Sequence, residues 1–412
     1  MTESVRDYLG EAVIKALRRP VLDDARGLPA KVYTDQQFLA MENAHLFPST
    51  WTGVAFASDV PQPGDVMPFE LCGIPLILLR GEDGQVRVFQ NVCRHRATIV
   101  VQAPLTAQSM LKCPYHGWVY GLDGALIATP FWDGTADSHR LPVDASCNGL
   151  VAVRCDVWNH VVFVNLDGKA LPLLEYLAPM QTELEHLAID ELEVGHREEW
   201  TFNANWKLVM ENWEVYHHVW VHEGVFDRMS DEVDLRTGEP YTDMIADGNA
   251  LLLRYKASRP QTWARRRPNV PGQPLPPVRQ VAPRETPHST ANAVLPNTTV
   301  TINDTAFVPA IYLPIAPGKT LARMAWYFAP GAAQDERFRP HIEKVLDRWL
   351  GPTRRFEDKG GIRPQDHHCM ELQQRARSSP VADDVKFSTT WEANVRYFQD
   401  WVLRRLERVE EV

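Results

Sequence analysis

The sequence predicts an α+β protein with two domains, the first built from antiparallel strands and the second from an antiparallel sheet with long helices. A chain of 412 residues is longer than one hydrophobic core usually covers, so two domains are expected. Hairpin signals with short strands occur in the first half, and longer helical patterns occur in the second half. These observations favour a β domain followed by a mixed domain.

The N-terminal residues favour helices. Apolar residues recur at helical spacing from Val5 to Leu17, a loop ends at Pro29, and a second helical pattern covers about 35–46. Charged residues interrupt the first stretch, which therefore lacks the apolar core of a signal peptide, and export is not expected. We expect residues 1–43 to form a helical segment that packs on the second domain.

Two pairs of short apolar runs are each separated by a turn sequence that contains Asp-Gly. This pattern predicts two hairpins, 74–79 with 86–89 and 119–120 with 125–127. Strands at 151–153 and 161–165 would complete the same β unit. The first domain is therefore predicted to cover residues 44–166.

The remaining residues, 167–412, are predicted to form the second domain. The helices are expected at 171–187, 206–219, 341–350 and 391–406, with a loop after 350, and the strands at 194–202, 298–302, 310–313 and 321–328. The segment 259–287 is rich in proline and contains Arg265–Arg267. Such a composition disfavours helix and strand. An ordered loop or mobile lid explains it as well as a solvated surface insertion does.

Two short motifs in the first domain each combine one cysteine with one histidine. Cys93-Arg94-His95 is followed after seventeen residues by Cys113-Pro114-Tyr115-His116. A Rieske [2Fe–2S] centre needs two thiolates on one iron and two imidazoles on the other, and its imidazoles raise the reduction potential. We predict that Cys93 and Cys113 hold the buried ferric iron, and that His95 and His116 hold the outer iron.

A Cys2His2 zinc site uses the same four donors and is the alternative. Structural zinc sites usually pair Cys with Cys and His with His, whereas both pairs are mixed here. Chance spacing is a weaker explanation, because two of only six cysteines fall in this stretch. The mixed pairs favour the iron–sulfur cluster.

A second polar cluster lies in the second domain. Residues 211–222 contain three histidines, His217, His218 and His222, and two glutamates within an otherwise apolar and aromatic segment. A non-haem Fe(II) that activates O2 needs two histidines and one carboxylate on one face, which leaves positions for O2 and substrate. Asp366 begins another polar cluster, and its carboxylate could serve as the third ligand of this site.

Both clusters resemble those of the Rieske oxygenase family. Asn91 to Arg96 and Cys113 to Trp118 are similar to its cluster motif, and Tyr216-His217-x4-His222 is similar to its iron-binding segment. The resemblance implies a terminal oxygenase α subunit of the ring-hydroxylating type, in which His217, His222 and Asp366 bind Fe(II). It also implies a Rieske β domain followed by a helix-grip-like α+β catalytic domain. The expected reaction is O2-dependent monooxygenation, namely hydroxylation or oxidative demethylation, with aromatic cis-dihydroxylation as the alternative.

The iron segment departs from the family in two ways. His218 is an additional imidazole. On an unbroken helix the i,i+4 pair His218 and His222 would chelate a metal better than the i,i+5 pair His217 and His222. The match of Tyr216-His217 to the family motif and the position of Glu214 nevertheless favour His217. Most ring-dihydroxylating members have Asp at the position of Glu214. A Glu here is similar to the branch of the family that includes the oxygenases of glycine betaine, choline and carnitine. The resemblance implies that this carboxylate bridges a cluster histidine of one subunit to an iron histidine of the next, in a homotrimer that can include a small β subunit.

The substrate is the least constrained feature. Trp206, Trp213, Tyr216 and Trp220 surround the iron segment and could hold a quaternary ammonium group by cation–π contacts, although core packing is the commoner fate of such residues. Arg265–Arg267 could instead meet a carboxylate.

Composition narrows the partners and the location. A net charge of −10 argues against nucleic acid, and no apolar run reaches the ~18 residues that a membrane span needs. The cysteines show no disulfide framework, which suits the cytoplasm. No Gly-rich dinucleotide fingerprint follows a strand, so electrons are expected to come from NAD(P)H through a separate flavin reductase, a ferredoxin, or both.

Overall fold

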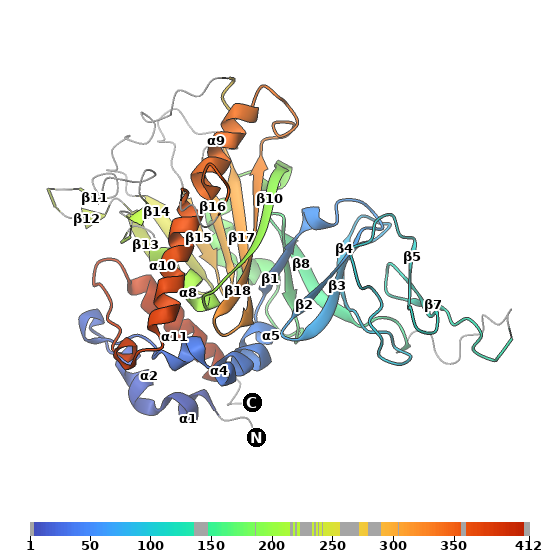
Figure 1. Ribbon diagram of the computed structural model, residues 1–412, viewed down its shortest axis with the longest axis horizontal. Coiled ribbons are helices and arrows are strands. Elements are labelled where there is room, and N and C mark those ends of the chain that lie inside the picture. Colours follow the sequence, from blue (N-terminus) through green and yellow to red (C-terminus); the bar gives the residue numbers. More distant parts are fainter. Residues whose placement is uncertain are drawn as a thin grey trace. The chain divides into compact units, whose positions relative to one another are not determined.

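The chain divides into two compact units in the computed structural model. The large unit comprises Met1–Leu46 and Leu174–Val412, and the small unit comprises Phe47–Leu173 (Figure 1). The structure describes residues 4–135, 147–185, 187–214, 217–218, 221–222, 233–234, 236–237, 239–240, 242–255, 272–278, 290–303, 305–355 and 360–407.

Antiparallel strands form the small unit, as predicted. A six-stranded sheet has the order β1-β9-β8-β4-β3-β2, and β5, β6 and β7 form a second sheet. The elements are α5 (Phe47–Ser49), β1 (Thr52–Phe56), β2 (Val66–Leu71), β3 (Ile74–Arg80), β4 (Val86–Gln90), β5 (Met110–Lys112), β6 (Val119–Gly121), β7 (Leu126–Ala128), β8 (Ala152–Trp158) and β9 (Val161–Asn165). Both predicted hairpins are confirmed, since β3 pairs with β4 and β6 with β7.

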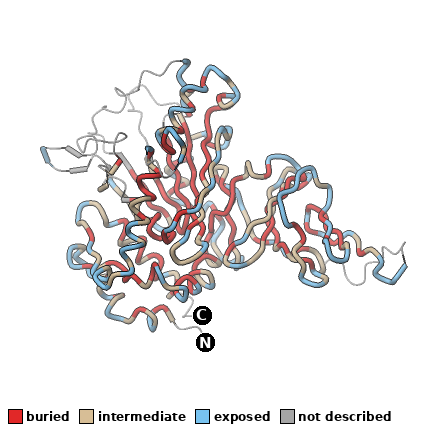
Figure 2. Tube along the Cα trace, viewed as in Figure 1, coloured by how far each residue is buried: buried red, intermediate tan, exposed pale blue. Residues whose placement is uncertain are grey.

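The large unit is built around a seven-stranded antiparallel sheet. Its order is β10-β18-β17-β16-β15-β14-β13, and β11 and β12 pair separately. The strands are β10 (Glu193–Phe202), β11 (Val233–Asp234), β12 (Glu239–Pro240), β13 (Thr242–Asp247), β14 (Ala250–Tyr255), β15 (Thr290–Val294), β16 (Thr298–Ile302), β17 (Phe307–Ala316) and β18 (Lys319–Phe328). The central strands are buried along most of their length (Figure 2).

Helices complete the large unit. They are α1 (Val5–Leu9), α2 (Glu11–Leu17), α3 (Lys31–Thr34), α4 (Gln36–Met41), α6 (Leu173–Tyr176), α7 (Ala178–Leu184), α8 (Trp206–Glu211), α9 (Arg339–Leu350), α10 (Ile362–Ala376) and α11 (Ala393–Glu407). Helix α8 packs against α10, α11 and strand β17, so the helices that flank the second polar cluster lie directly on the sheet (Figure 1).

Three sequence predictions about helices were wrong. The helix predicted from Val5 to Leu17 is broken at Gly10, whose φ of 85° a helix cannot accommodate. The helix predicted for 206–219 ends as α8 at Glu211 and is followed by a 3-10 turn at Asn212–Glu214. The loop predicted after Leu350 contains α10. This helix buries polar side chains, Asp366 among them, and so has no apolar stripe for the sequence to reveal.

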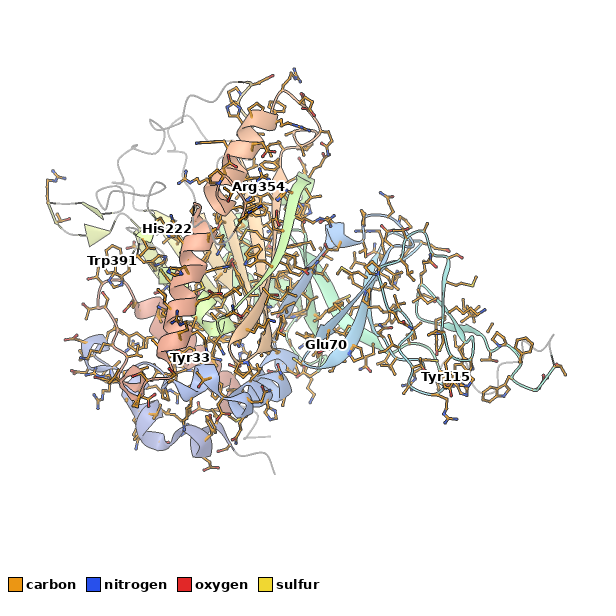
Figure 3. The ribbon with its side chains drawn as sticks, in the orientation of Figure 1. Tyr33, Glu70, Tyr115, His222, Arg354 and Trp391 are labelled. Atoms are coloured by element: carbon orange, nitrogen blue, oxygen red, sulfur yellow. The ribbon has the colours of Figure 1, made fainter. Side chains whose placement is uncertain are left out.

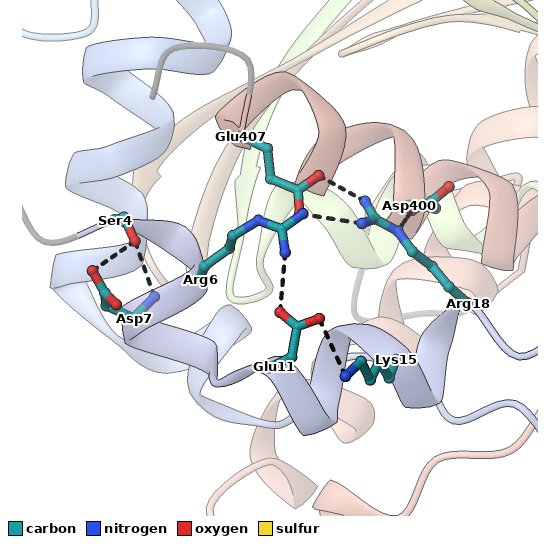
Figure 4. A network of polar contacts seen from close by, with 8 residues as sticks. All are labelled: Ser4, Arg6, Asp7, Glu11, Lys15, Arg18, Asp400 and Glu407. Atoms are coloured by element: carbon teal, nitrogen blue, oxygen red, sulfur yellow. Dashed lines mark hydrogen bonds and ion pairs between the residues drawn. The ribbon is translucent and has the colours of Figure 1, made fainter. Parts of the chain in front are cut away.

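Ion pairs attach the first two helices to the last one (Figure 4). Arg18 contacts Asp400 and Glu407 at 2.5 and 2.8 Å, and Arg6 contacts Glu407 at 2.9 Å. Glu407 is only 14% exposed and is shared by both arginines. A network of this kind is worth more than the ~0–1 kcal/mol of an isolated surface pair. It supports packing of the N-terminal helices on the large unit.

Most of the proline-rich segment 259–287, including Arg265–Arg267, lies outside the described residues. Within the described part of the chain, no helix is both long and apolar enough to cross a membrane.

Candidate metal centres

The two Cys/His motifs of the small unit form matching turns. In the first turn the amide of Cys93 donates to Thr98 O at 2.8 Å and the amide of Ala97 to Cys93 O at 3.0 Å. In the second, Cys113 donates to Trp118 O at 2.8 Å and Gly117 to Cys113 O at 3.1 Å. The fourth residue after each cysteine has a positive φ, 53° at Ala97 and 73° at Gly117. Two equivalent loops therefore present their cysteines to one centre.

The cysteines are buried, whereas His95 is partly exposed and His116 is exposed. Cys93 and Cys113 are each 2% exposed within the core of the small unit, whereas His116 is exposed. The rings of His95 and His116 lie with centroids 4.6 Å apart, and Trp118 stacks on His95 at 4.9 Å. Buried Nδ1 of His95 has no hydrogen-bond partner among the described residues. An unpartnered ring nitrogen is what a metal ligand requires.

Hydrogen bonds surround the cysteine sulfurs. The buried hydroxyl of Tyr120 lies 3.2 Å from Cys93 Sγ and accepts the amide of Arg94 at 2.9 Å. Burial raises the pKa of the Cys113 thiol, while backbone amides of Tyr115 and His116 act in the opposite direction. A bound cation would favour the thiolate of Cys113, and hydrogen bonds to the sulfurs of a cluster tune the reduction potential of that cluster.

The four donors are not gathered as one zinc would gather them. The ligand atoms of one tetrahedral zinc are roughly 3.3–3.8 Å apart. Among the described residues, the group with three donor atoms within 4.8 Å of one another is His218, His222 and Asp366, and it lies in the large unit. The wider spacing at Cys93, His95, Cys113 and His116 fits a cluster with two metal ions.

The three residues of the large unit converge on one point. Nε2 of His218 and Nε2 of His222 both lie 3.3 Å from Oδ1 of Asp366. The side chains of His222 and Asp366 are only 4% and 6% exposed, and that of His218 is 17% exposed. Figure 3 labels His222. Two imidazoles and one carboxylate that face one another are the donor set of a facial-triad Fe(II) site.

The surroundings hold these groups in the protonation states that a metal needs. His222 Nδ1 lies 3.2 Å from Oε1 of buried Gln365, a contact that turns Nε2 toward Asp366. Burial lowers the pKa of His222, which favours the neutral ring. Burial alone would raise the pKa of Asp366, but His218, His222 and Arg363 hold it well below its usual range. The carboxylate of Asp366 is therefore ionised, and its Oδ1 faces Nε2 of both rings.

His217, which the sequence favoured as a ligand, does not join this group. Its Nδ1 lies 3.2 Å from Glu392 Oε1, and its ring is parallel to that of Trp391 with the ring centroids 6.0 Å apart. In this arrangement the ring of His218, and not that of His217, faces Asp366. The local reason is that α8 has ended before this segment, so helical spacing does not decide which ring faces Asp366.

Other side chains near Asp366 have structural partners. His367 accepts a hydrogen bond from Trp200 Nε1 at 2.9 Å and stacks on Phe202, and burial lowers its pKa to about 3. Glu371 accepts the amide of Asn203 at 2.9 Å. Trp206 is fully buried and donates to Glu42, so it is a core residue. The structure does not describe the side chains of Glu214, Tyr216 and Trp220.

Helix α8, which leads into the histidine segment, is fixed by buried polar contacts. Asn205 caps the helix and donates to Pro317 O at 2.6 Å. Lys207 pairs with Glu42 at 2.6 Å, and both side chains are at most 1% exposed. Glu211 accepts from Tyr33 at 2.5 Å. Removing one partner of such a buried pair costs about 3–5 kcal/mol, so α8 is held firmly.

The roles of Gln365 and Arg363 and the Trp200–His367 contact could not be predicted from the sequence. Gln365 and Arg363 flank the candidate ligand Asp366, but their roles depend on the unpredicted helix α10. Only their position beside Asp366 could have drawn attention to them.

A buried cluster-type site in a β unit and a facial triad on an α+β unit define the class of Rieske non-haem iron oxygenases. Comparison with known families agrees. Residues 50–139 match the Rieske [2Fe-2S] domain, and residues 189–408, more than half of the chain, match the catalytic domain of the ring hydroxylating alpha subunit. The chain belongs to this family of terminal oxygenase α subunits.

Curated relatives include both monooxygenases and dioxygenases. The chain is 26% identical to the glycine betaine monooxygenase oxygenase subunit of Chromohalobacter salexigens, over 91% of this chain and 84% of the relative. It is 28% identical to the 2-aminobenzenesulfonate 2,3-dioxygenase subunit alpha of Alcaligenes sp, over 78% of each chain. The family is therefore established, and the substrate is not.

Solved structures share the fold. A quaternary ammonium Rieske monooxygenase with γ-butyrobetaine superposes with a TM-score of 0.71, at 20% identity over 95% of this chain and 98% of the other. Naphthalene 1,2-dioxygenase from Rhodococcus sp. gives 0.73, at 20% identity over 97% and 99%. The predicted fold class is confirmed. The protein is an oxidoreductase that requires a [2Fe–2S] cluster, Fe(II), O2 and electron-transfer partners.

Proposed function

We propose that this terminal oxygenase catalyses O2-dependent monooxygenation, meaning hydroxylation or oxidative demethylation, of a small organic substrate. The observation that carries the proposal is the convergence of two imidazoles on the ionised carboxylate of Asp366 in the large unit. Such a site leaves several metal positions for O2 and substrate. Electrons would come from NAD(P)H through a separate reductase, with or without a ferredoxin.

Cys93, Cys113, His95 and His116 are proposed as the cluster ligands. The cysteines would hold the buried iron and the histidines the outer iron, since the cysteines lie in the core and the histidines toward the surface. When bound, the cluster supplies one-electron transfer and the mononuclear Fe(II) supplies O2 activation. Tyr120 would donate to the Cys93 sulfur, and Trp118 would hold the His95 ring in place.

The mononuclear iron would be held by His222, Asp366 and one imidazole of the neighbouring pair His217 and His218. Position favours His218, whose Nε2 is 3.3 Å from Asp366. Spacing favours His217, because Tyr216-His217-x4-His222 is similar to the family motif. The other imidazole would lie beside the site without binding iron. If that imidazole is His217, its contact with Glu392 would hold it there.

We expect only one of the variants His217→Ala and His218→Ala to lose the mononuclear iron, because one imidazole completes the triad and the other does not touch the metal. Iron content per chain and the visible spectrum of the cluster measure this directly. His341→Ala, on α9, is the control and should keep both centres. Retention of the mononuclear iron by both variants would show that neither ring is a ligand.

Three features of the assembly are also proposed. Glu214 would bridge the cluster of one subunit to the iron of the next, since a carboxylate between two imidazoles fixes both tautomers. The subunits would form a homotrimer, with or without a small β subunit. The protein would work in the cytoplasm, which suits its six unbridged cysteines.

Monooxygenation is preferred because the glycine betaine monooxygenase relative aligns over 91% of the chain. Cis-dihydroxylation of an aromatic ring or aromatic acid is the second candidate, favoured by the similarity to 2-aminobenzenesulfonate 2,3-dioxygenase.

Turnover of a substrate panel under 18O2 tests the reaction type. The panel should contain quaternary ammonium carboxylates and aromatic acids, with a suitable reductase and NADH. We expect a hydroxylated or demethylated product whose new oxygen derives from O2, so that one labelled atom enters organic product. A parallel reaction in H2 18O controls for exchange with water. A cis-diol that carries both labelled atoms would contradict monooxygenation and support the second candidate.

A further inference from the structure

Arg363 is a buried arginine one helical turn before Asp366. Its residue is 3% exposed, and it lies in the first turn of α10. Residues three apart on a helix are neighbours on one face, so Arg363 and Asp366 project to the same side. The charge of Arg363 also contributes to the depressed pKa values of Asp366 and His222. Arg363 therefore lies close to the candidate iron triad.

Two aromatic rings flank the guanidinium. Its central carbon lies 5.2 Å from the ring centroid of Trp349 on α9 and 5.9 Å from that of Tyr312 on β17. The start of α10 is pressed against the end of α9, since a Cβ at Gly361 would collide with the backbone nitrogen of Gly351. The close approach of the two helices fixes Arg363 between strand β17 and helix α9.

The described residues provide no anionic partner for this arginine. Its buried Nε has no hydrogen-bond partner among them, and no ion pair in the described part of the chain includes Arg363. Asp366, whose carboxylate interacts electrostatically with Arg363, directs Oδ1 toward His218 and His222. Burying an uncompensated charge is expensive, so proteins rarely keep one without a purpose.

Neutral donors lie on the same side of the sheet. Thr299 pairs with Ala310 across β16 and β17, and Tyr312 is two residues further along β17, so both side chains project from the face that Arg363 covers. Both are at most 1% exposed, and the hydroxyl of Thr299 lies beside that of Tyr312. The guanidinium and these hydroxyls make a polar corner in an otherwise apolar and aromatic wall.

The charges near this corner favour an anion. A bound Fe(II) brings two positive charges, Asp366 one negative charge and Arg363 one positive charge, so the site would carry about two uncompensated positive charges. A planar guanidinium presents a fork of donors that matches a carboxylate with two parallel hydrogen bonds. The apolar remainder of such a ligand would lie toward the triad.

We propose that Arg363 binds the carboxylate of the substrate and that the oxidised substrate is therefore an organic carboxylate. This assignment rests on the proposed function, because it uses the triad as the reacting centre. Arg363 is then a specificity-determining residue, and Tyr312 and Thr299 assist it. A purely structural arginine, held only by its two aromatic neighbours, is the competing explanation.

Binding to the protein with both metal centres loaded distinguishes the two. Isothermal titration would compare two matched pairs of probes, benzoate with benzamide and glycine betaine with choline, in a buffer free of carboxylates. Wild type should bind at least one carboxylate in clear preference to its neutral or cationic counterpart. Arg363→Gln should weaken that binding at least about 30-fold, because losing one partner of a buried charge pair costs about 2 kcal/mol or more.

Control variants separate charge from fold. Arg363→Lys keeps the charge but loses the fork, and should fall between wild type and Arg363→Gln. Arg339→Gln, on α9 with its side chain 67% exposed, should bind as wild type does. No preference for either carboxylate in wild type, or unchanged binding in Arg363→Gln, would overturn the assignment.

Thermal unfolding without ligand gives an independent readout. If Arg363 has no anionic partner until a carboxylate binds, Arg363→Met removes an uncompensated buried charge and should raise the unfolding midpoint by about 2–4 °C. If Arg363 is structural, the same variant loses its aromatic contacts and the midpoint falls, which would contradict the proposal. Iron and sulfide analysis of each sample tells the cases apart: absent metals count against the proposed function, whereas present metals without carboxylate preference count only against Arg363.

Discussion

Cys113→Ala is expected to give a protein that lacks the red-brown colour of a Rieske cluster and has no turnover. Cys113 is 2% exposed in the core of the small unit, where its sulfur would be one of two thiolates on the buried iron. Removing it leaves three donors, and no other cysteine among the described residues lies in that core with Cys93. Visible absorption and acid-labile sulfide per chain measure the loss.

Cys155→Ala is the matched control. Cys155 lies on β8 in the same unit and is half-buried. Burial raises the pKa of its thiol, as it does for Cys113. Its removal should leave the cluster spectrum and the activity near those of wild type. A full cluster spectrum in Cys113→Ala would show that the cluster is held by other residues.

Asp366→Ala is expected to empty the mononuclear site while the cluster spectrum stays intact. Asp366 is the carboxylate on which His218 and His222 converge, and an ionised carboxylate cannot be replaced by a methyl group as a metal ligand. Turnover should fall by more than the roughly 100-fold that follows loss of a residue that only supports a ligand. Iron per chain should drop by the share that belongs to the mononuclear site.

Glu371→Ala provides the comparison on the same helix. Its carboxylate accepts hydrogen bonds from Asn203 and has a structural role, so this variant should keep its iron. Iron retained in Asp366→Ala but lost in Glu371→Ala would reassign the carboxylate ligand.

Features that depend on neighbouring residues were predictable from the sequence. The hairpins β3–β4 and β6–β7 could be predicted because turn residues and strand alternation are local signals. The Cys/His pairs could be recognised for the same reason, since each pair lies within one turn of the chain. The likeness of the two turns around Cys93 and Cys113 then follows from their equivalent hydrogen bonds.

Features that depend on distant contacts were not predictable. Helix α10 was missed because tertiary packing buries its polar residues, so Asp366 and Gln365 break the apolar stripe by which helices are recognised. The ring that faces Asp366 could not be chosen from spacing either. That choice depends on how the chain leaves α8 at Glu211, and on Glu392, which is 175 residues away from His217.

The large unit is discontinuous in sequence, and this affects the order of events during synthesis on the ribosome. Residues up to Leu46 belong to a unit that also needs α11, whereas Phe47–Leu173 is one continuous stretch. At about 5–20 residues per second, the N-terminal helices emerge roughly 20–80 seconds before Asp400 and Glu407, to which Arg18 is bound in the finished protein. The small unit can fold and receive its cluster during this interval. Apolar faces of the first helices therefore stay exposed until α11 has emerged, which is longer than in a domain made from one continuous stretch.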